Sequence, residues 1–156
     1  MATKSSKPSK SAEPTKVNST THLDVPAEQV WQMIGQFKSF ADWHPAVEKS
    51  ELEQGGSVRR LSLIGGGTIV ERLERIDDES FKYRYSIVDS PLPVANYVSE
   101  LRVVKDDSGN GCSVEWSSEF APAAGTSTSD AEKSIRDIYD AGLNNLQSLF
   151  VKKQPG

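Results

Sequence analysis

The sequence predicts an α+β fold: one seven-stranded antiparallel sheet, a long C-terminal helix packed against it, and two short helices after the first strand. Two observations support this prediction. Short β-type segments alternate with turn sequences up to residue 120, and residues 129–152 then carry apolar side chains at intervals of three and four. A long amphipathic helix after a run of antiparallel strands needs the sheet to cover its apolar face.

The composition narrows the class of protein. The chain has 156 residues, 36% hydrophobic and 26% charged, which is enough for one domain with a substantial core. A net charge of -4 gives no broad basic surface, so nucleic acid is not an expected partner. No apolar run is long enough to span a membrane and the start lacks a signal-peptide core, so we expect no membrane insertion and a cytoplasmic location.

The N-terminal residues 1–16 are rich in Ser, Lys and Pro and contain little that could be buried. A segment of this composition does not gain enough from burial to offset the entropy of ordering. We therefore predict a disordered tail over residues 1–16 and a single folded domain over residues 17–152. Cys112 is the one cysteine of the sequence, so no internal disulfide can form.

The first half of the domain contains one strand and the two short helices. Residues 17–24 are enriched in Thr and Val and are predicted as a strand. A helix then begins at Pro26, with Asp24 as its predicted cap. Residues 40–45 form a second helical turn that Pro45 ends.

Six further strands follow, separated by turn sequences. They are predicted at residues 47–53, 57–64, 68–76, 80–88, 96–105 and 112–120. The segments between them are rich in Gly, Asp, Asn and Pro, which turns favour.

The C-terminal helix has marked ends and one apolar stripe. Ser129 and Glu132 have the spacing of a capping box at its start. The predicted end is marked by Lys152, Lys153 and Pro155. The stripe consists of Ala131, Ile135, Ile138, Tyr139, Gly142, Leu146, Leu149 and Phe150.

The middle of this stripe is narrow. Ala141 and Gly142 are very small, and Asn145 follows one turn later. Small residues in mid-helix indicate either close approach of two backbones or space for a ligand, and the spacing does not decide between them. Ile138, Ala141 and Asn145 are therefore candidate ligand-binding residues on the helix.

The inward-facing rows of the sheet combine aromatic rings that end in polar groups with small hydroxyl side chains. A dry core favours aliphatic residues because each buried hydroxyl needs a partner, whereas a pocket for a mostly apolar ligand uses this mixture. The alternative is a core whose hydroxyls are all satisfied. Alternation along the strands makes the following residues ligand-binding candidates: Tyr83, Tyr85, Ile87, Tyr97, Ser99, Val114, Trp116 and Ser118.

Glu71 shares a strand face with Ile69 and Leu73. Alternation alone does not decide which face of this strand is buried. If Glu71 points inward, an apolar cavity would raise the pKa of its carboxyl group into a range that suits proton transfer, which makes it the candidate catalytic residue. The alternative is a structural Glu71 paired with a basic residue or water.

Several short sequences occur in the order found in a known superfamily. Val25-Pro-Ala-Glu-Gln-Val-Trp follows the first strand, Trp43-His-Pro ends the second helical turn, and Val114-Glu-Trp precedes the last helix. Over residues 17–152 the chain resembles the START-like (Bet v 1-like, SRPBCC) superfamily, and within it the polyketide cyclase/dehydrase-like group. The resemblance implies a helix-grip fold, with the sheet curved around the C-terminal helix and a deep cavity that binds lipids, sterols, hormones or polyketide-like molecules.

Residues 70–99 also resemble the plant abscisic-acid receptors, through Glu71-Arg72-Leu73 and Asn96-Tyr97-Val98-Ser99. The resemblance implies that Glu71, Tyr97 and Ser99 face the cavity and hold polar groups of the ligand, and that Asn145 contacts the ligand from the helix. The chain departs from these receptors at Gly65-Gly66-Gly67, which replaces their Ser-Gly-Leu-Pro-Ala gate. No Lys or Arg is expected inside, so a carboxylate ligand is not favoured.

No established catalytic pattern is present. His22, His44 and Cys112 lack the spacing of metal ligands, so we expect no metal and no cofactor. His44 precedes a proline at the end of the second helical turn, where it is interpreted either as a residue at the pocket entrance or as a surface or capping residue.

Three functions remain open. The first is binding of a small hydrophobic ligand, of lipid, polyketide or aromatic type, in an internal cavity. The second is a polyketide cyclase/dehydratase-like enzyme that uses Glu71 with a tyrosine as acid and base. The third is a protein-interaction module with a vestigial pocket, which a cavity blocked by Trp116, Tyr85 and Phe81 would support. The sequence names no protein partner.

Overall fold

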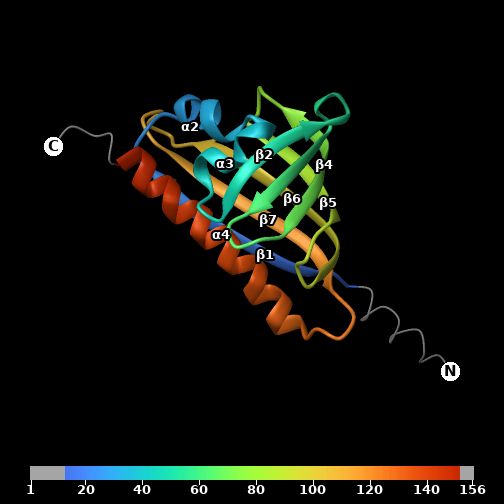
Figure 1. The fold of residues 1–156 in the computed structure, drawn as a ribbon. Coiled ribbons are helices and arrows are strands. Elements are labelled where there is room, and N and C mark those ends of the chain that lie inside the picture. The colour runs from blue at the N-terminus through green and yellow to red at the C-terminus, as the bar shows by residue number, and fades with distance from the viewer. Residues whose placement is uncertain (1–12, 152–156) are drawn as a thin grey trace.

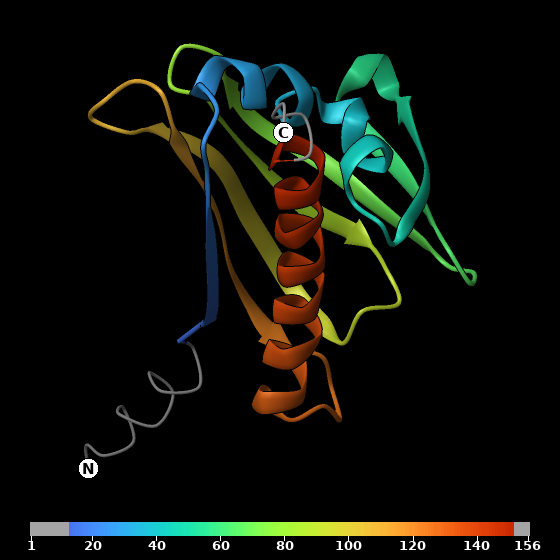
Figure 2. The same ribbon diagram turned by 90° about the vertical axis from the view of Figure 1, so that its left-hand side faces the viewer.

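The computed structural model describes residues 13–151, in which the seven strands form one antiparallel sheet in the order β1-β7-β6-β5-β4-β3-β2. The sheet curves around the long helix α4 (Figures 1 and 2). The strands are β1 (Thr15–Leu23), β2 (Val47–Glu53), β3 (Val58–Leu63), β4 (Thr68–Asp77), β5 (Lys82–Asp89), β6 (Val94–Lys105) and β7 (Cys112–Pro122). The helices are α2 (Ala27–Ile34), η1 (Phe37–Ser39), α3 (Phe40–Trp43), η2 (Gln54–Gly56) and α4 (Thr128–Val151). The predicted helix-grip α+β fold is confirmed, and each predicted strand is found with its ends within two residues of the expected positions.

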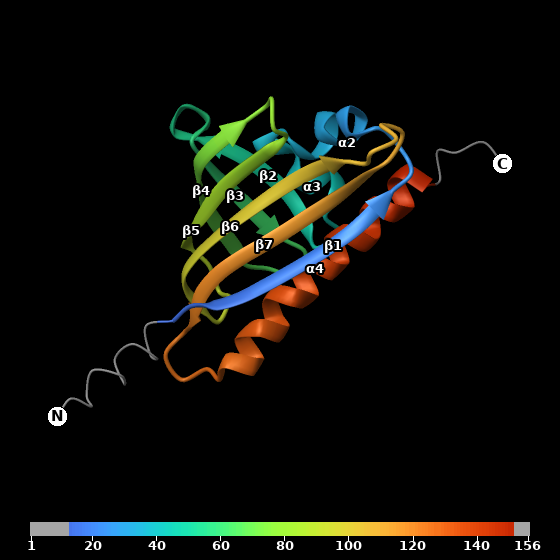
Figure 3. The ribbon, with the colours of Figure 1, turned by 180° about the vertical axis from the view of Figure 1, so that it is seen from behind.

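The two edges of the sheet lie near different helices. At the β1 edge, the Ser19 hydroxyl donates to Oδ1 of Asp140 of α4, and Nε2 of Gln147 of α4 donates to the Thr21 hydroxyl, so α4 runs along this strand (Figure 3). At the other edge, the chain passes from α3 directly into β2. The helices α2 and α3 lie over one end of the sheet, on the side that carries α4 (Figure 2).

The main core lies between the concave face of the sheet and α4. The buried residues of α4 are Ala131, Ile135, Tyr139, Gly142, Leu143, Leu146 and Phe150. Most of the predicted stripe is thus buried, with Leu143 added, whereas Ile138 and Leu149 are half-buried at its border. Strand alternation is also confirmed, because the rows of β5, β6 and β7 that were expected to face inward are largely buried.

The starts of two helices differ from the prediction. The Oγ of Ser127, not Ser129, caps α4 by accepting a hydrogen bond from the backbone N–H of Asp130 at 3.1 Å. The capping box of Ser129 with Glu132 is therefore wrong, because Ser129 already lies inside the first turn. Helix α2 has Pro26 in its cap position and no side-chain cap, so Asp24 does not have the predicted role.

The predicted boundaries of the domain fall partly outside the described residues. Lys152, Lys153 and Pro155, expected at the end of α4, lie outside them, as do the first twelve residues of the predicted tail. Thr15 and Lys16, the last two residues of that predicted tail, are paired with β7 in β1.

Candidate ligand site between the sheet and α4

An ion pair occupies the interior of the fold. Arg59 of β3 lies directly opposite Glu71 of β4 in the antiparallel register, and both side chains point to the concave face. Nε of Arg59 donates to Oε1 of Glu71 at 2.7 Å. The residues are 0% and 4% exposed, so this pair is removed from solvent. The inward orientation of Glu71, which alternation left open, is thus decided by the tertiary structure.

The Arg59 guanidinium has further partners and one unused donor. Nη1 donates to the backbone carbonyl of Phe37 at 2.8 Å and to the hydroxyl of Tyr83 at 3.3 Å. Nη2 lies 2.7 Å from Oε1 of Glu71, but its alignment is not that of a hydrogen bond. One edge of the guanidinium therefore keeps donor capacity that no described protein atom uses.

Aromatic rings enclose this cation. Its central carbon lies 4.2 Å from the ring centre of Phe37, 4.6 Å from that of Phe40 and 5.1 Å from that of Tyr85. Ring faces attract a cation that has lost its water, and they do so most strongly when it is buried. The rings thus offset part of the cost of removing Arg59 from solvent.

Burial and pairing act in opposite directions on the two charges. Burial disfavours the Arg59 cation, but the nearby Tyr83 and Glu71 outweigh it, and the pKa of Arg59 lies above its usual value. Burial raises the pKa of Glu71, and the attraction of Arg59 offsets this only in part. Arginine keeps its proton at any physiological pH, so the interior needs the Glu71 carboxylate as its counter-charge.

The expectation that no Lys or Arg lies inside was wrong, because Arg59 does. Two signals in the sequence could have found it. Arg59 alternates in phase with Leu61, and a hairpin turn at residues 64–67 pairs position 59 with position 71. A basic residue and an acidic residue directly opposite on neighbouring strands form a favourable cross-strand pair.

A cluster of hydrogen-bonded side chains, the tyrosine cluster, joins the sheet to α4 through the hydroxyl groups of Tyr85, Tyr97 and Tyr139. The hydroxyl of Tyr97 lies 3.1 Å from that of Tyr85 and 2.5 Å from that of Tyr139. Tyr139 is also 3.0 Å from Oγ of Ser99, and Trp116 Nε1 donates to the Tyr85 hydroxyl at 3.1 Å. Burial raises the pKa of Tyr139 to about 12 and those of Tyr85 and Tyr97 well above the usual value, so these tyrosines are neutral phenols at neutral pH.

Aromatic rings fill the space between the sheet and α4. Trp116 of β7 stacks on Tyr139 of α4 with ring centres 4.2 Å apart, and Trp43 of α3 lies 5.4 Å from Trp116. Phe40 lies 5.8 Å from Trp116 on the same side. Two buried polar atoms, Nε1 of Trp43 and Oγ of Ser118, have no hydrogen-bond partner among the described residues.

The structure brings most of the candidate residues together. Those buried in the interior are Glu71, Tyr83, Tyr85, Tyr97, Ser99, Val114, Trp116 and Ser118. Ile87, Ile138, Ala141 and Asn145 are half-buried at its border. Asn145 Nδ2 donates to the carbonyl of Trp43 at 2.8 Å, so this side chain is directed to α3.

The surroundings of Gly142 show whether the small residues in the middle of α4 serve close packing or leave space for a ligand. A Cβ added there would lie 2.8 Å from Cδ2 of His44, 3.0 Å from Cζ3 of Trp43 and 3.1 Å from Cζ3 of Trp116. The 2.8 Å contact is shorter than Cβ atoms make in folded proteins unless the neighbour moves, and the other two are tighter than most. The small residue at this position therefore serves close packing of α4 against α3 and β7.

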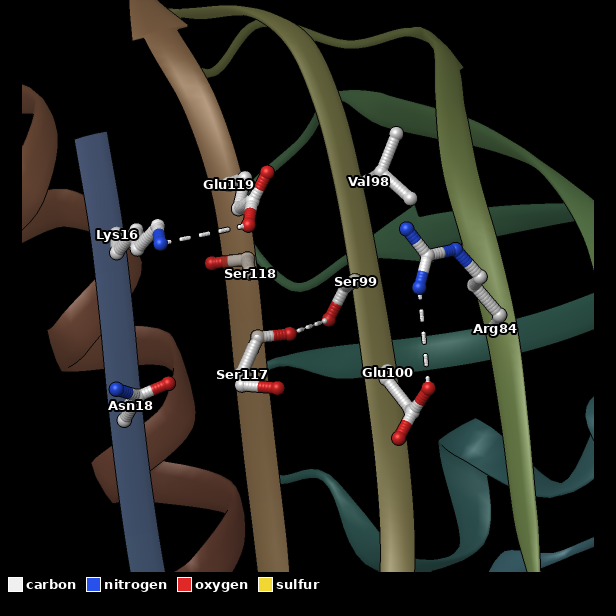
Figure 4. A pocket seen from close by; sticks show the side chains of 9 residues that line it. All are labelled: Lys16, Asn18, Arg84, Val98, Ser99, Glu100, Ser117, Ser118 and Glu119. Atoms are coloured by element: carbon white, nitrogen blue, oxygen red, sulfur yellow. Dashed lines mark hydrogen bonds and ion pairs between the residues drawn. The ribbon is translucent and has the colours of Figure 1, made fainter. Parts of the chain in front are cut away.

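The convex face of the sheet carries a shallow hollow of about 320 Å³. Its rim includes two ion pairs, Lys16 with Glu119 and Arg84 with Glu100, and between them lie small polar side chains such as Ser117 (Figure 4). This hollow is polar and open to solvent. It differs in both respects from the internal apolar site that the sequence analysis predicts.

Residues 13–151 contain no cluster of three or more His, Cys, Asp and Glu side chains arranged to hold a metal ion. Within the same part of the chain, no helix is long and apolar enough to cross a membrane.

Comparison with known proteins gave a match to a family model and matches to solved structures. A family model described as polyketide cyclase / dehydrase and lipid transport matches residues 14–151. Comparison with curated proteins gave no match.

Several solved structures are similar to this one. The protein XoxI from Bacillus cereus is 38% identical with a TM-score of 0.87, over 91% of this chain and 99% of its own. An uncharacterized protein from Bacillus thuringiensis is 40% identical with a TM-score of 0.84, over 87% of this chain and 98% of its own. The Zhui aromatase/cyclase from a Streptomyces species shares the fold, with 21% identity and a TM-score of 0.73 over 90% of this chain and 95% of its own.

Proposed function

Because the chain belongs to the polyketide cyclase / dehydrase and lipid transport family, we propose that it binds a small, mostly apolar molecule between the concave face of the sheet and α4. The observation that carries this proposal is the Arg59–Glu71 pair, buried among aromatic rings. The polar groups of the ligand would meet this pair and the tyrosine cluster, and its apolar body would meet the rings.

The ion pair is a costly way to build a core. Removing two charges from water costs several kcal/mol per ion, and well-packed apolar residues in place of such a pair are often neutral or stabilising, by about 1–4 kcal/mol. A core selected for stability alone therefore does not need Arg59 and Glu71. Their presence, with an unused donor on Arg59 Nη2, supports a role in holding a ligand.

The surroundings favour a flat ligand with neutral oxygen atoms, such as a polyketide-type or aromatic molecule. The interior presents ring faces, which stack well on planar molecules. The charge of Arg59 is already balanced by Glu71 at 2.7 Å. A ligand carboxylate would place a second anion beside one cation, whereas a carbonyl or hydroxyl oxygen accepts a hydrogen bond without adding charge.

The rings that fill the interior must move before such a ligand can enter. Packing of Trp116, Tyr85 and Phe81 in the cavity was expected to support the third hypothesis, a protein-interaction module with a vestigial pocket. Trp116 and Tyr85 are buried in the interior, whereas Phe81 is half-buried and stacks on Trp31. A binding function therefore depends on a second, open arrangement of these rings. Absence of any bound or captured ligand would favour the third hypothesis.

Mass spectrometry of small molecules that co-purify with the native protein tests the proposal first. The double variant Arg59→Met with Glu71→Leu then tests the site, because it removes both charges together. We expect this variant to remain folded and to lose the co-purified molecule or bind it at least tenfold more weakly.

The matched control is Arg102→Met with Glu115→Leu, which removes an ion pair of the same 2.7 Å length from the convex face. This control should bind as the wild type does. Equal affinity of the interior and surface double variants would show that the ligand does not use the buried pair.

One observation favours the enzyme hypothesis. Burial raises the pKa of Glu71, which is a property of general acids and bases. The close contact with Arg59 opposes this role, because the guanidinium favours the ionised carboxylate and binds one of its two oxygens, Oε1. The polyketide cyclase/dehydratase-like activity therefore remains the second candidate, and Glu71→Gln distinguishes it from binding alone.

A further inference from the structure

The rings that close the interior on one side come from a single short segment. Residues 37–46 carry η1 and α3, and their side chains Phe40, Trp43 and His44 pack against the β7 ring of Trp116. All of these side chains are buried. Movement of this one segment would remove several rings together and leave room for a planar molecule.

This segment is joined to α4 by two polar contacts. Nε2 of His44 lies 2.8 Å from the carbonyl oxygen of Ile138, and Nδ2 of Asn145 donates to the carbonyl of Trp43 at 2.8 Å. The flank of α4 beside these contacts is half-buried and consists of small or polar residues, Ala141 and Asn145. The contacts between α3 and α4 are therefore made by buried residues of α3, while the adjoining flank of α4 is partly exposed to solvent.

The contacts of His44 define one protonation state. The backbone N–H of Ala46 donates to Nδ1 of His44 at 3.1 Å, so Nδ1 carries no proton. Nε2 then carries the proton and donates to the Ile138 carbonyl. A second proton on Nδ1 would face the Ala46 N–H, donor against donor, and would place a charge on a side chain that is only 2% exposed.

We propose that residues 37–46 form a lid over the interior site and that His44 is its latch, closed while the imidazole is neutral and released when it is protonated. The part that concerns the interior site rests on the proposed function. The latch itself rests on the contacts of His44.

The surroundings of His44 contain no counter-charge that would hold a cation in place. Among residues 13–151 no ion pair includes His44. The charged residues on the elements that adjoin His44 are Lys38 of η1, Asp42 of α3, Glu48, Lys49, Glu51 and Glu53 of β2, Glu115 and Glu119 of β7, and Asp130, Glu132, Lys133, Arg136, Asp137 and Asp140 of α4. Arg59, whose guanidinium contacts the Phe40 ring, is a cation already paired with Glu71, while Asp137 bonds to Lys133 and Asp140 to Ser19.

The direction of the pH effect follows from these contacts. Burial lowers the pKa of His44, and the hydrogen bond to Ile138 opposes this only in part. An imidazole released to solvent has its ordinary pKa of about 6.5. The open state therefore binds the proton more tightly, and its population rises as the pH falls below that value.

Opening of the lid would also expose the Arg59–Glu71 ion pair. Phe40 contacts both His44, with ring centres 5.1 Å apart, and the Arg59 guanidinium, 4.6 Å from its ring centre. When α3 moves away from α4, Phe40 leaves the cation and the free edge of Arg59 becomes accessible. The lid thus links protonation of His44 to access at the polar end of the interior site.

Hydrogen exchange of the full chain tests the latch without any ligand. We expect protection of the Ala46 and His44 amides, corrected for intrinsic exchange, to fall by up to tenfold for each pH unit below about 6.5 until His44 is protonated in the closed state as well. The His44→Gln variant keeps a donor for the Ile138 carbonyl but cannot be protonated, so its protection should not depend on pH. Asn145→Ala should lower protection at every pH and leave the pH dependence unchanged.

Uptake of Nile red, a neutral planar dye, tests whether the lid controls the interior. In the wild type the association rate of Nile red should rise as the pH falls, with the same midpoint as the loss of protection. In His44→Gln the rate should not depend on pH. His22→Gln, which removes the other, exposed histidine, should behave as the wild type does.

The outcomes separate the two proposals. Protection at Ala46 that does not change with pH in the wild type would overturn the latch, even if Nile red binds. Loss of protection without dye uptake would support the latch and overturn the interior site. Should His44→Gln fail to fold, the ring titration of His44 by NMR in the wild type decides instead, because its midpoint must coincide with the loss of protection.

Discussion

Trp116 of β7 and Tyr139 of α4 stack face to face, with ring centres 4.2 Å apart and planes inclined by 16°. The contact joins β7, the strand next to the β1 edge of the sheet, to the middle of the helix. It also directs the Tyr139 hydroxyl to Tyr97 and Ser99, so apolar stacking and hydrogen bonding act at the same position.

Tyr139→Phe tests the polar half of this contact. The stacking survives, but Tyr97 and Ser99 lose a buried hydrogen-bond partner, which costs about 1–3 kcal/mol. We expect urea unfolding to show a loss of that size with an unchanged m-value. A variant as stable as the wild type would mean that Tyr97 and Ser99 find other partners.

Gly142→Ala should destabilise the protein by about 1–3 kcal/mol, because the new methyl group meets His44, Trp43 and Trp116 at 3.1 Å or less. The matched control is Ala141→Leu at the half-buried neighbouring position. It should lower the melting temperature less and should reduce Nile red uptake more. A larger loss of stability in Ala141→Leu than in Gly142→Ala would contradict the assignment of the tight contact to Gly142.

Glu71→Gln separates binding from catalysis. The amide keeps the shape of the carboxylate but cannot transfer a proton. For a protein that only binds, affinity for the co-purified molecule should change by about 1.5–3 kcal/mol, the value of a hydrogen bond to a charged group. Turnover of that molecule by the wild type that falls by roughly 10²–10⁴ in a variant that still binds it would instead identify a general acid or base.

Stability should fall below neutral pH because of His44. Burial lowers its pKa, so between that value and about 6.5 the unfolded chain binds more protons than the folded chain. The contribution of His44 is complete above that range and is lost as the pH falls through it. Unfolding free energies measured from pH 5 to 8 should show this slope in the wild type and a smaller one in His44→Gln.

His22 supplies a control, because its contribution to stability changes with pH in the opposite direction to that of His44. The hydrogen bond to Asp106 raises the pKa of His22, so its contribution is present at low pH and is lost as the pH rises through the raised value. His22→Gln should therefore steepen the decline of stability toward acid. A flatter profile would contradict the assignment of the slope to His44.

The start of α4 can be tested with two neighbouring serines. Ser127→Ala removes the cap and should cost about 0.5–2 kcal/mol. Ser129→Ala should change little, because Ser129 lies inside the first turn. Equal effects of the two changes would contradict the cap at Ser127.

Patterns of local sequence were sufficient to predict the elements and their buried faces. Alternation in β5 and β7 identified Tyr83, Tyr85 and Trp116 as inward-facing, because a strand can bury only every second residue when one face is covered. Helical spacing identified most of the α4 stripe for the corresponding reason. The candidate site residues follow from these periodicities, and the structure places them in or at the border of one interior.

The tertiary structure alone decided how these residues are used. The sequence does not show that the Phe37 carbonyl and the Phe40 ring enclose Arg59, because they reach it through the packing of α3 over the sheet. Nor does it show the bond between His44 and the Ile138 carbonyl, which joins positions 94 residues apart. Periodicity reports which side of an element is buried, whereas the partner of a buried polar group depends on which distant segment folds over it.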